Sequence, residues 1–378
     1  MSTDFNQTLT TYRRALHKIP ELGFDLFKTH AYIKETLESF GYDVLNVAQT
    51  GIVAIKEGKE DRGIAFRADM DALPINEATE ETYASIHPGK MHACGHDGHM
   101  AMLLGLAQRL STMETQKRIM FVFEPAEETY GGAREIVRTG LFDTHNIEAI
   151  FALHLQPELE EGKLGLTDGI MTAQDGDFDM VITGLNAHGT QPHLGSDTAL
   201  AASALIMQYH TIIGRSVNPL NPGSINVGTL NLGEGRNIIA HEARLSGSIR
   251  AFDHSNFTLL KKRMKEIDAG IEQSYNVKID NRITDLHPPV NNDSTLYKIV
   301  SNTISADDYV KLEPQMLAED FSYYQQEIPG LFIMLGSKNI PKGFVHPLHS
   351  NRFNFDEKVL EKGVETFMHI AKTFDALR

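Results

Sequence analysis

The stretch MHACGHDGHM, residues 91–100, contains the only cysteine of the chain and three of its 17 histidines. Cys94 and His96 stand two positions apart, in a segment that leads into a helical pattern. A thiolate and an imidazole with this spacing can bind one cation, and coordination would deprotonate the thiol. A lone cysteine is also compatible with a small buried hydrophobic side chain, so this stretch alone leaves both interpretations open. A structural zinc module would need paired cysteines, and the spacing argues against one.

Acidic and imidazole side chains at four other places could complete such a site. Most of these side chains follow apolar runs that predict strands. In open α/β sheets, ligands bind at the edge where the carboxyl ends of the strands meet. Paired glutamates are commonly solvated, and a histidine within an apolar run is more often a hydrogen-bonded core residue. The hypothesis of a single metal site therefore requires that these side chains lie close to Cys94 and His96 in the folded protein. The side chains concerned are Asp69 and Asp71 in RADMD, Glu127 and Glu128 in EPAEE, His154 in EAIFALHL, and His349 in PLHSNRF.

Glu127 and Glu128 suggest what chemistry the site would perform. Neighbouring side chains point in different directions, so one carboxylate can bind metal while the other faces the substrate as a general base. Metal-assisted hydrolysis needs this division of roles.

Strands and helices alternate along the first half of the chain and could position these residues. Apolar runs at 51–58, 62–69, 118–125 and 148–155 predict strands, and helical periodicity appears at 4–18, 28–41, 98–113 and 132–142. Strands this apolar predict a mostly parallel sheet with helices on both faces, the architecture of an α/β protein.

The middle of the chain has a different order of elements. Strand patterns at 177–184, 224–231, 242–252 and 277–286 and helical patterns at 198–213 and 256–275 follow one another as β-α-β-β-α-β. This order predicts a ferredoxin-like domain. We therefore expect a discontinuous catalytic α/β domain, residues 1–176 and 291–378, with a ferredoxin-like domain inserted at residues 177–290.

Composition restricts the class of partner. The formal net charge of −15 argues against nucleic acid or an anionic membrane surface as the main partner. No stretch approaches the roughly 20 apolar residues of a membrane span, and the opening segment does not resemble a signal peptide. A single cysteine cannot form an internal disulfide, which fits a reducing compartment. These features predict a soluble, cytoplasmic protein.

Eight motifs occur in order along the chain and resemble the amidohydrolase branch of the M20 metallopeptidase clan. They are RADMDALPI, MHACGHDGH, PAEE, ALHL, NAHGTQPH, GRNIIA, AEDF and PLHSNRF, preceded by RRALHKIPELGF, which is also typical of the branch. The branch contains N-acyl-amino-acid deacylases, hippurate hydrolases, auxin-conjugate hydrolases and N-acetyldiaminopimelate deacetylases. The resemblance implies a two-metal α/β hydrolase domain, an inserted lid domain through which the protein forms a homodimer, and a small N-acyl amino acid or dipeptide as substrate.

The resemblance also implies a role for individual residues. Glu127 would be the general base, Asp69 would orient a neighbouring ligand, and His96 would bridge two divalent ions, for which Mn²⁺ or Zn²⁺ is favoured over Ni²⁺ or Co²⁺. His92 and His99 would shape the loop and the following helix without contacting the ions. The expected metal ligands are Cys94, His96, Glu128, His154 and His349.

In the second domain the resemblance points to residues that would contact substrate. His188 would stabilise the oxyanion across the dimer interface, with His193 as the competing histidine. Asn237 and Arg250 would bind the α-carboxylate of the substrate, and a planar guanidinium suits a carboxylate because it binds through two nitrogens. A strand-end surface arginine is an almost equally good interpretation of Arg250.

The sequence departs from the branch at two places near the expected site. Glu124 stands where the branch often has Gln, and His188-Gly189-Thr190 replaces His-Ala-Ala; both changes could alter the acyl or leaving-group pocket. The sequence around His349 is similar to general amidohydrolases rather than to diaminopimelate deacetylases. The primary hypothesis is thus a metallo-amidohydrolase acting on N-acyl amino acids.

Three alternatives remain. Within the same chemistry they are an N-acetyl-L,L-diaminopimelate deacetylase of lysine biosynthesis and a dipeptidase or aminoacylase. A non-catalytic binding protein on the same scaffold would be expected to lack the base or a ligand, and none is missing here.

Overall fold

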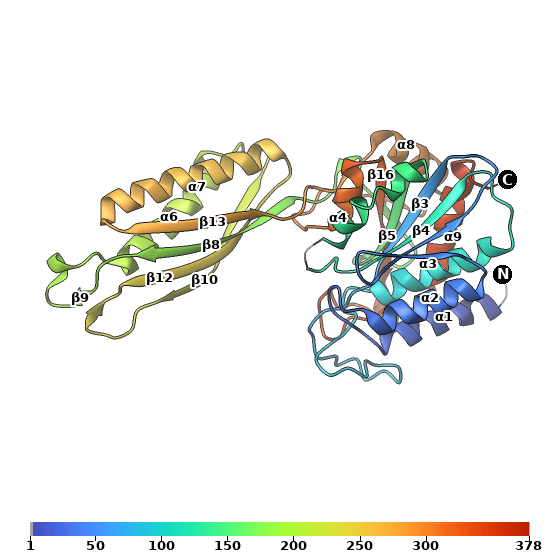
Figure 1. Ribbon diagram of the computed structural model, residues 1–378, viewed down its shortest axis with the longest axis horizontal. Helices are drawn as coiled ribbons and strands as arrows, with labels where there is room; N and C mark the ends of the chain where they lie inside the picture. The colour runs from blue at the N-terminus through green and yellow to red at the C-terminus, as the bar shows by residue number, and fades with distance from the viewer. Residues whose placement is uncertain (1–2, 130, 378) are drawn as a thin grey trace. The chain divides into compact units, whose positions relative to one another are not determined.

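The computed structural model describes residues 3–129 and 131–377 of the 378-residue chain. The chain divides into two compact units (Figure 1). The first unit comprises Met1–Met171, Asn291–Glu313 and Asp320–Arg378, and the second comprises Thr172–Val290 and Pro314–Glu319. The sequence predicted an insertion over 177–290, and its strand and helix pattern did not indicate that Pro314–Glu319 belongs with the inserted unit.

The first unit is an α/β sheet with helices on both faces, which confirms the predicted fold class. The helices are α1 (Thr3–His17), α2 (Phe27–Ser39), α3 (His96–Ser111), α4 (Gly132–Val137), α5 (Leu141–Thr144), α8 (Ser294–Thr303) and α9 (Val359–Thr373), with 3-10 turns η2 (Asp320–Gln326) and η3 (Ile340–Lys342). The strands of the large sheet, in spatial order, are β1 (Val44–Val47), β2 (Gly51–Lys56), β4 (Arg118–Glu124), β3 (Gly63–Asp69), β5 (Ile147–Glu160), β16 (Gly330–Lys338), β6 (Leu164–Leu166) and β15 (Tyr309–Lys311). A small separate pair is formed by β7 (Gly169–Ile170) and β14 (Asn291–Asn292).

The central strands β4, β3, β5 and β16 are parallel and buried on both faces. Successive side chains of a strand point to opposite faces. Phe66 accordingly packs in the hydrophobic core with residues of α1, α2, α3, α8 and α9. The next residue, Arg67, points to the other face and reaches Asp320 of η2. One face of β3 is thus apolar core, and the other carries a buried polar cluster.

Helix α3 is the central helix of the first unit, with 13 of its 16 residues buried. It begins at His96 because Gly95 adopts a left-handed backbone conformation with φ of +89°. A Cβ at Gly95 would lie only 2.9 Å from the Leu155 side chain, so glycine is required at this turn. The turn places the motif of Cys94 and His96 directly against β5.

Two predicted elements have different limits in the structure. The helix expected at 132–142 is broken into α4 and α5, because Gly140 takes a left-handed conformation between them. Strand β5 continues beyond His154 to Glu160, since its pairing with β16 extends to Lys338. His154 is therefore in the body of a strand and not at its end.

The second unit has the ferredoxin-like order of elements that the sequence predicted. Its sheet is antiparallel in the order β10-β12-β8-β13, and α6 and α7 pack on it around a shared core. Asp197 and Asp253 cap α6 and α7 by accepting hydrogen bonds from backbone N–H groups of their first turns. The elements are β8 (Gln174–Thr183), β9 (Ala187–His188), η1 (Pro192–Leu194), α6 (Thr198–Arg215), β10 (Gly223–Leu232), β11 (Ile238–Ile239), β12 (Glu242–Ala251), α7 (His254–Tyr275) and β13 (Lys278–Asp285).

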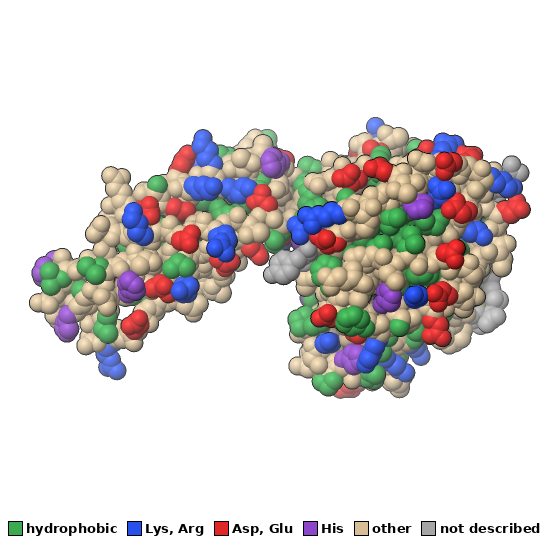
Figure 2. All heavy atoms as spheres, in the orientation of Figure 1, with side chains coloured by type: hydrophobic (Ala, Val, Ile, Leu, Met, Phe, Trp, Pro, Cys, Tyr) green, Lys and Arg blue, Asp and Glu red, His purple; other side chains and the backbone are tan. Residues whose placement is uncertain are grey.

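The surface carries both signs of charge. Figure 2 shows basic side chains interspersed with acidic ones on the visible face of each unit. Across residues 3–129 and 131–377, the structure contains no helix with the length and apolar character needed to cross a membrane.

Candidate metal centre

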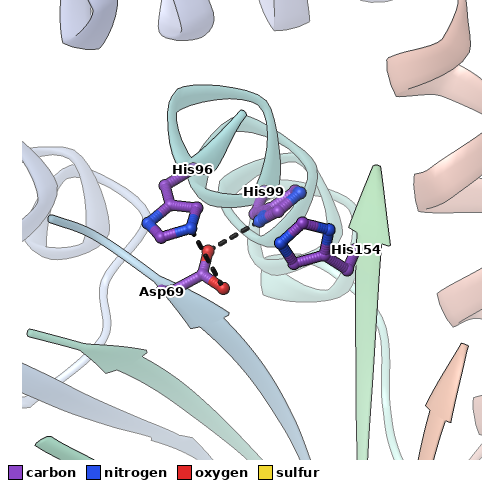
Figure 3. A group of neighbouring side chains, drawn as sticks. All are labelled: Asp69, His96, His99 and His154. Atoms are coloured by element: carbon purple, nitrogen blue, oxygen red, sulfur yellow. Dashed lines mark hydrogen bonds and ion pairs between the residues drawn. The ribbon is translucent and has the colours of Figure 1, made fainter. Parts of the chain in front are cut away.

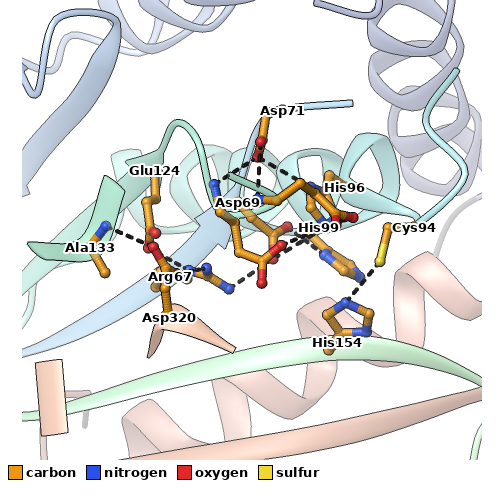
Figure 4. Close-up of polar contacts among 12 residues, drawn as sticks. Arg67, Asp69, Asp71, Cys94, His96, His99, Glu124, Ala133, His154 and Asp320 are labelled. Atoms are coloured by element: carbon orange, nitrogen blue, oxygen red, sulfur yellow. Dashed lines mark hydrogen bonds and ion pairs between the residues drawn. The ribbon is translucent and has the colours of Figure 1, made fainter. Parts of the chain in front are cut away.

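Side chains from distant parts of the chain converge in the first unit (Figure 4). Those drawn in Figure 4 come from the end of β3, the turn after β4, the body of β5 and the start of α3. His349 joins them from a turn shortly before α9. The convergence brings together Asp69, Cys94, His96, Glu127, Glu128, His154 and His349, whose mutual contacts are described below.

Cys94, Glu128 and His349 form the first donor group. One potential ligand atom from each lies within 4.8 Å of the others, and Nε2 of His349 is 3.3 Å from Oε1 of Glu128. The backbone N–H of His349 donates to the carbonyl of Ala93 at 2.9 Å, which ties its turn to the loop of Cys94. His349 has a left-handed φ of +62°, a strained conformation for a non-glycine residue. Sulfur, oxygen and nitrogen donors are therefore within reach of a single cation.

His96, Glu127 and Glu128 form a second donor group. Nε2 of His96 is 3.9 Å from Oε2 of Glu127 and also 3.9 Å from Oε1 of Glu128. Glu128 belongs to both donor groups and is the residue they share. His96 also belongs to a further group, with Asp69, His99 and His154, so the bridge through His96 that the resemblance implies stays a prediction.

His154 faces Cys94, with its Nε2 3.5 Å from the sulfur. Its Nδ1 is 2.8 Å from the carbonyl oxygen of Leu155, so Nδ1 carries the hydrogen and donates it. This tautomer leaves the lone pair of Nε2 directed at the thiol. A metal-ligating histidine typically has its other ring nitrogen held in this way.

His99 is close to the same group, and Figure 3 shows its contact with Asp69. Both of its ring nitrogens are already bonded. Nδ1 lies 2.6 Å from Oδ1 of Asp69, and the backbone N–H of Leu155 donates to Nε2 at 2.9 Å. Since an amide N–H can only donate, Nε2 is the acceptor and Nδ1 donates to Asp69. His99 thus links β3 to β5 and has no ring nitrogen left for a metal.

Asp69 is fully buried and accepts a second hydrogen bond from Nη1 of Arg67 at 2.7 Å. Burial alone would raise the pKa of Asp69, but His96, His99 and Arg67 hold it well below its usual value. Asp69 is accordingly an anion that orients His99 and lies 3.8 Å from Nε2 of His96.

Arg67 is held by three carboxylates on the second face of the sheet. Besides Asp69, its guanidinium donates to Glu124 at 2.7 Å and to Asp320 at 3.1 Å. Glu124, the acid that replaces the more common Gln, is fully buried and also accepts the hydroxyl of Tyr324 at 2.8 Å. In this arrangement Glu124 is a counter-charge for Arg67 beneath the metal centre.

Asp71 is a functional residue to which sequence reasoning gave no role. Its Oδ1 accepts the backbone N–H of Glu127 at 3.0 Å and its Oδ2 accepts that of Glu128 at 3.1 Å. The preceding Ala126 has a left-handed φ of +60°, so the turn is strained and needs such an anchor. The only available signal was the second acid of RADMD, and its backbone partners become visible only in the structure.

Unpaired polar atoms indicate that the cluster fits divalent cations. Among the described residues, neither ring nitrogen of the buried His96 makes a hydrogen bond within 3.5 Å, although carboxylate oxygens lie 3.7 to 3.9 Å from them. Burial, Glu128 and Glu127 raise the pKa of the Cys94 thiol well above its ordinary value, so a thiolate needs a cation beside it. Burial would lower the pKa of His96, but Asp69, Asp71 and Glu128 raise it to about 10. The concentration of negative charge that attracts a proton to His96 also favours a metal ion.

Two residues of the N-terminal motif RRALHKIPELGF contact the first turn of α3 through Asp97. Arg13 donates to Oδ2 of Asp97 at 3.0 Å, and Nδ1 of His17 lies 2.8 Å from the same oxygen. Nε2 of His17 is 3.1 Å from Glu77. All of these side chains have at most 5% of their surface exposed. The cluster fixes Asp97, which directly follows the candidate ligand His96.

His17 should make the stability of the fold depend on pH. Burial alone would lower its pKa, but Asp97 and Glu77 raise it from 6.5 to about 9. Because the folded-state pKa is the higher one, the charged ring stabilises the fold fully below pH 6.5, and this contribution is lost as the pH rises through about 9. The difference in free energy of unfolding between the wild type and His17→Gln should shrink by about 3 kcal/mol over this range. Denaturant unfolding at constant metal content measures it, and a difference independent of pH would show that the folded ring is uncharged.

The second unit contains the residues expected to contact substrate, in two separate places. His188 in β9 pairs with Ile238 in β11, directly after Asn237, so His188 and Asn237 are neighbours. Arg250 is near the other end of the ten-residue strand β12 and donates to the carbonyl of Met316 at 2.7 Å. The segment of β12 from Glu242 to Arg250 alone spans roughly 25 Å. His193 is exposed in η1.

The α/β unit brings a thiol, imidazoles and paired glutamates together at one site, a set of donors that can hold divalent cations for hydrolysis. The chain belongs to peptidase family M20/M25/M40, whose model matches residues 65–373.

Individual relatives agree with this membership. An N-acetyldiaminopimelate deacetylase of Exiguobacterium sibiricum is 36% identical over 366 residues, which are 96% of this chain and 98% of that protein. A putative aminohydrolase from methicillin-resistant Staphylococcus aureus superposes with a TM-score of 0.92 at 29% identity, over 99% of this chain and 97% of that one. The Bacillus subtilis YXEP protein is described as a dinuclear metal-binding peptidase of the M20 family. It superposes with a TM-score of 0.85 at 30% identity, over 99% of each chain. The predictions of the M20 resemblance and of an amidohydrolase are confirmed.

Proposed function

We propose that this enzyme hydrolyses the amide bond of N-acyl amino acids, with two divalent cations held by Cys94, His96, Glu128, His154 and His349. The observation that carries the proposal is the pair of adjacent glutamates whose backbone is fixed by Asp71. Glu128 lies within both donor groups, and Glu127 lies beside it with 11% of its side chain exposed. One carboxylate can therefore bind metal while its neighbour meets substrate.

Different groups would carry out the separate steps of amide hydrolysis. When bound, the cations supply Lewis-acid polarisation of the amide carbonyl and make water a stronger acid at neutral pH; Mn²⁺ or Zn²⁺ fits best among Mn²⁺, Zn²⁺, Ni²⁺ and Co²⁺. Glu127 accepts a proton from the attacking water and passes it to the departing amine. Asp69 orients the cluster through His99, and Asp71 keeps Glu127 in place.

His188, Asn237 and Arg250 would act on the substrate. His188 donates a hydrogen bond to the oxyanion, and Asn237 and Arg250 bind the α-carboxylate. Because Arg250 is near the far end of β12 and Asn237 precedes the start of that strand, we infer that a single carboxylate contacts both only if two protomers contribute.

A homodimer would supply that second protomer, and the second unit has a suitable surface. Strand β10 is an edge strand of its sheet, next to α6. Leu200 and Met207, two turns apart on α6, are 59% and 72% exposed. Unpaired edge strands and exposed apolar side chains favour association with a second copy. Sedimentation velocity should therefore show a dimer, and we expect it in the cytoplasm, where the lone thiol stays reduced.

A substrate panel tests the proposal. With Mn²⁺ or Zn²⁺ added, N-acetyl and N-benzoyl amino acids should be hydrolysed faster than dipeptides. Activity on none of these compounds, by a protein with metal bound, would contradict the proposed function.

N-acetyl-L,L-diaminopimelate belongs in the same panel because a diaminopimelate deacetylase is 36% identical to this chain. A clear preference for it would identify the alternative function, a deacetylase of lysine biosynthesis, and a preference for dipeptides would indicate a dipeptidase. A non-catalytic binding protein is disfavoured because the proposed base and all five proposed ligands are present together.

A further inference from the structure

The backbone around His188 is held in a short ribbon of the second unit. His188 pairs with Ile238, and its carbonyl accepts the N–H of Gln191 at 2.7 Å. The N–H of Gly189 donates to the carbonyl of Asn237 at 2.8 Å. A Cβ at Gly189 would lie 3.2 Å from that oxygen, so glycine permits the close approach of the two strands. The position of the imidazole is thus set by its own backbone, even though its side chain is exposed.

Thr190 makes two contacts with one nitrogen of the imidazole. Its backbone N–H donates to Nδ1 of His188 at 3.2 Å, and its hydroxyl lies 2.7 Å from the same nitrogen. An amide N–H can only donate, so Nδ1 is an acceptor and carries no hydrogen. In the neutral ring the hydrogen must then be on Nε2, and the hydroxyl is free to donate to Nδ1 as well.

The remaining nitrogen is available for a ligand. Within the part of the chain that the structure describes, Nε2 of the exposed His188 makes no hydrogen bond. An N–H donor at this position can stabilise a developing oxyanion, whereas the other tautomer would present a lone pair and repel it. His193, the competing histidine, has no such contact on either ring nitrogen among the described residues, so nothing fixes its tautomer.

We propose that Thr190 is a positioning residue that holds His188 as the Nε2–H tautomer, so that the ring donates to the oxyanion formed when water attacks the amide carbonyl. This inference rests on the proposed function of His188. Thr190 stands where the branch usually has the second alanine of His-Ala-Ala. An alanine has no hydroxyl, so it could not make the additional hydrogen bond to Nδ1.

Thr190→Val tests the role of the hydroxyl in the complete metal-loaded enzyme. Valine keeps the shape of the side chain and the backbone N–H but loses the hydroxyl. Because the oxyanion exists only in the transition state, kcat should fall roughly threefold to tenfold, the equivalent of one hydrogen bond, with KM unchanged. Thr190→Ser should restore the wild-type kcat. Thr258→Val is a matched control, since the Thr258 hydroxyl is 3.4 Å from Nε2 of His254 in the same unit, and its kcat should equal that of the wild type.

Histidine-selective ¹⁵N NMR of the same enzyme reads the tautomer directly, with His188→Gln identifying the signal. We expect the hydrogen on Nε2 in the wild type and also in Thr190→Val, whose backbone N–H still donates to Nδ1, so that the lower kcat of this variant comes from a less firmly oriented ring. A wild-type ring with its hydrogen on Nδ1, or a mixture of tautomers, would overturn the inference. Wild-type kcat in Thr190→Val together with a slow His188→Gln would reject Thr190 but keep the role of His188. An unchanged kcat in His188→Gln would instead reject the oxyanion role itself.

Discussion

Glu127→Gln is expected to lower kcat by about 10²- to 10⁴-fold while the enzyme keeps its full metal content. The amide has the same shape as the carboxylate but cannot accept a proton from water. The turn that carries the residue should not move, because Asp71 holds it through the backbone N–H groups of residues 127 and 128. Steady-state kinetics and elemental analysis on the same preparation measure the two quantities.

The neighbouring Glu128→Gln is the matched control. Glu128 has the same side chain and the same backbone anchor, but its Oε1 belongs to both donor groups. Its replacement should reduce metal content and activity together. If Glu127→Gln hydrolysed substrate at the wild-type rate, the general base would be assigned to the wrong residue. If it lost metal as Glu128→Gln does, Glu127 would be a ligand.

Cys94→Ser is expected to weaken metal binding by more than the roughly 10- to 100-fold that follows loss of an outer-shell partner. Serine removes the thiolate from a group in which it faces both Nε2 of His154 and the carboxylate of Glu128. A neutral hydroxyl is a much poorer ligand for a transition metal than a thiolate. Metal titration by calorimetry gives the affinity, and elemental analysis after dialysis gives the occupancy.

Thermal unfolding provides a second measurement of the same change. Binding to the folded state alone stabilises it by mass action, so each tenfold loss of affinity removes about 1.4 kcal/mol of stabilisation at saturating metal. The wild type and Cys94→Ser should unfold at similar temperatures after chelation and at different temperatures with metal. Equal metal content and equal midpoints in both states would rule out a thiolate ligand.

The architecture was predictable because its signals are local. Nearly unbroken apolar runs predicted the buried strands β3 and β4, and the switch to β-α-β-β-α-β predicted the inserted unit. Segments such as β6 and β15 are only three residues long and have no periodicity to detect. The inclusion of Pro314–Glu319 in the second unit depends on a backbone contact, Leu317 with Ala173, between residues far apart in sequence.

The candidate site was predictable as a set of side-chain types but not as a set of contacts. Residue type and position identified Cys94, Glu127 and Glu128 as candidates, because the thiol is two positions from an imidazole and the paired acids follow an apolar strand pattern. The sequence could not show that Asp71 bonds to backbone amides rather than to a side chain. Only the resemblance separated His99 from His154, and the structure adds the physical reason, because both ring nitrogens of His99 are already bonded to protein atoms.

The wide spacing of the donors along the chain has a consequence for biosynthesis. Cys94, His96, Glu128 and His154 are translated before the second unit begins at Thr172, whereas His349 follows it. Domains generally fold as they leave the ribosome. The inserted unit can therefore form its sheet while the proposed metal site still lacks His349. On the proposed ligand set, full metal loading waits until the chain is nearly finished, and incomplete chains would lack one of the five ligands.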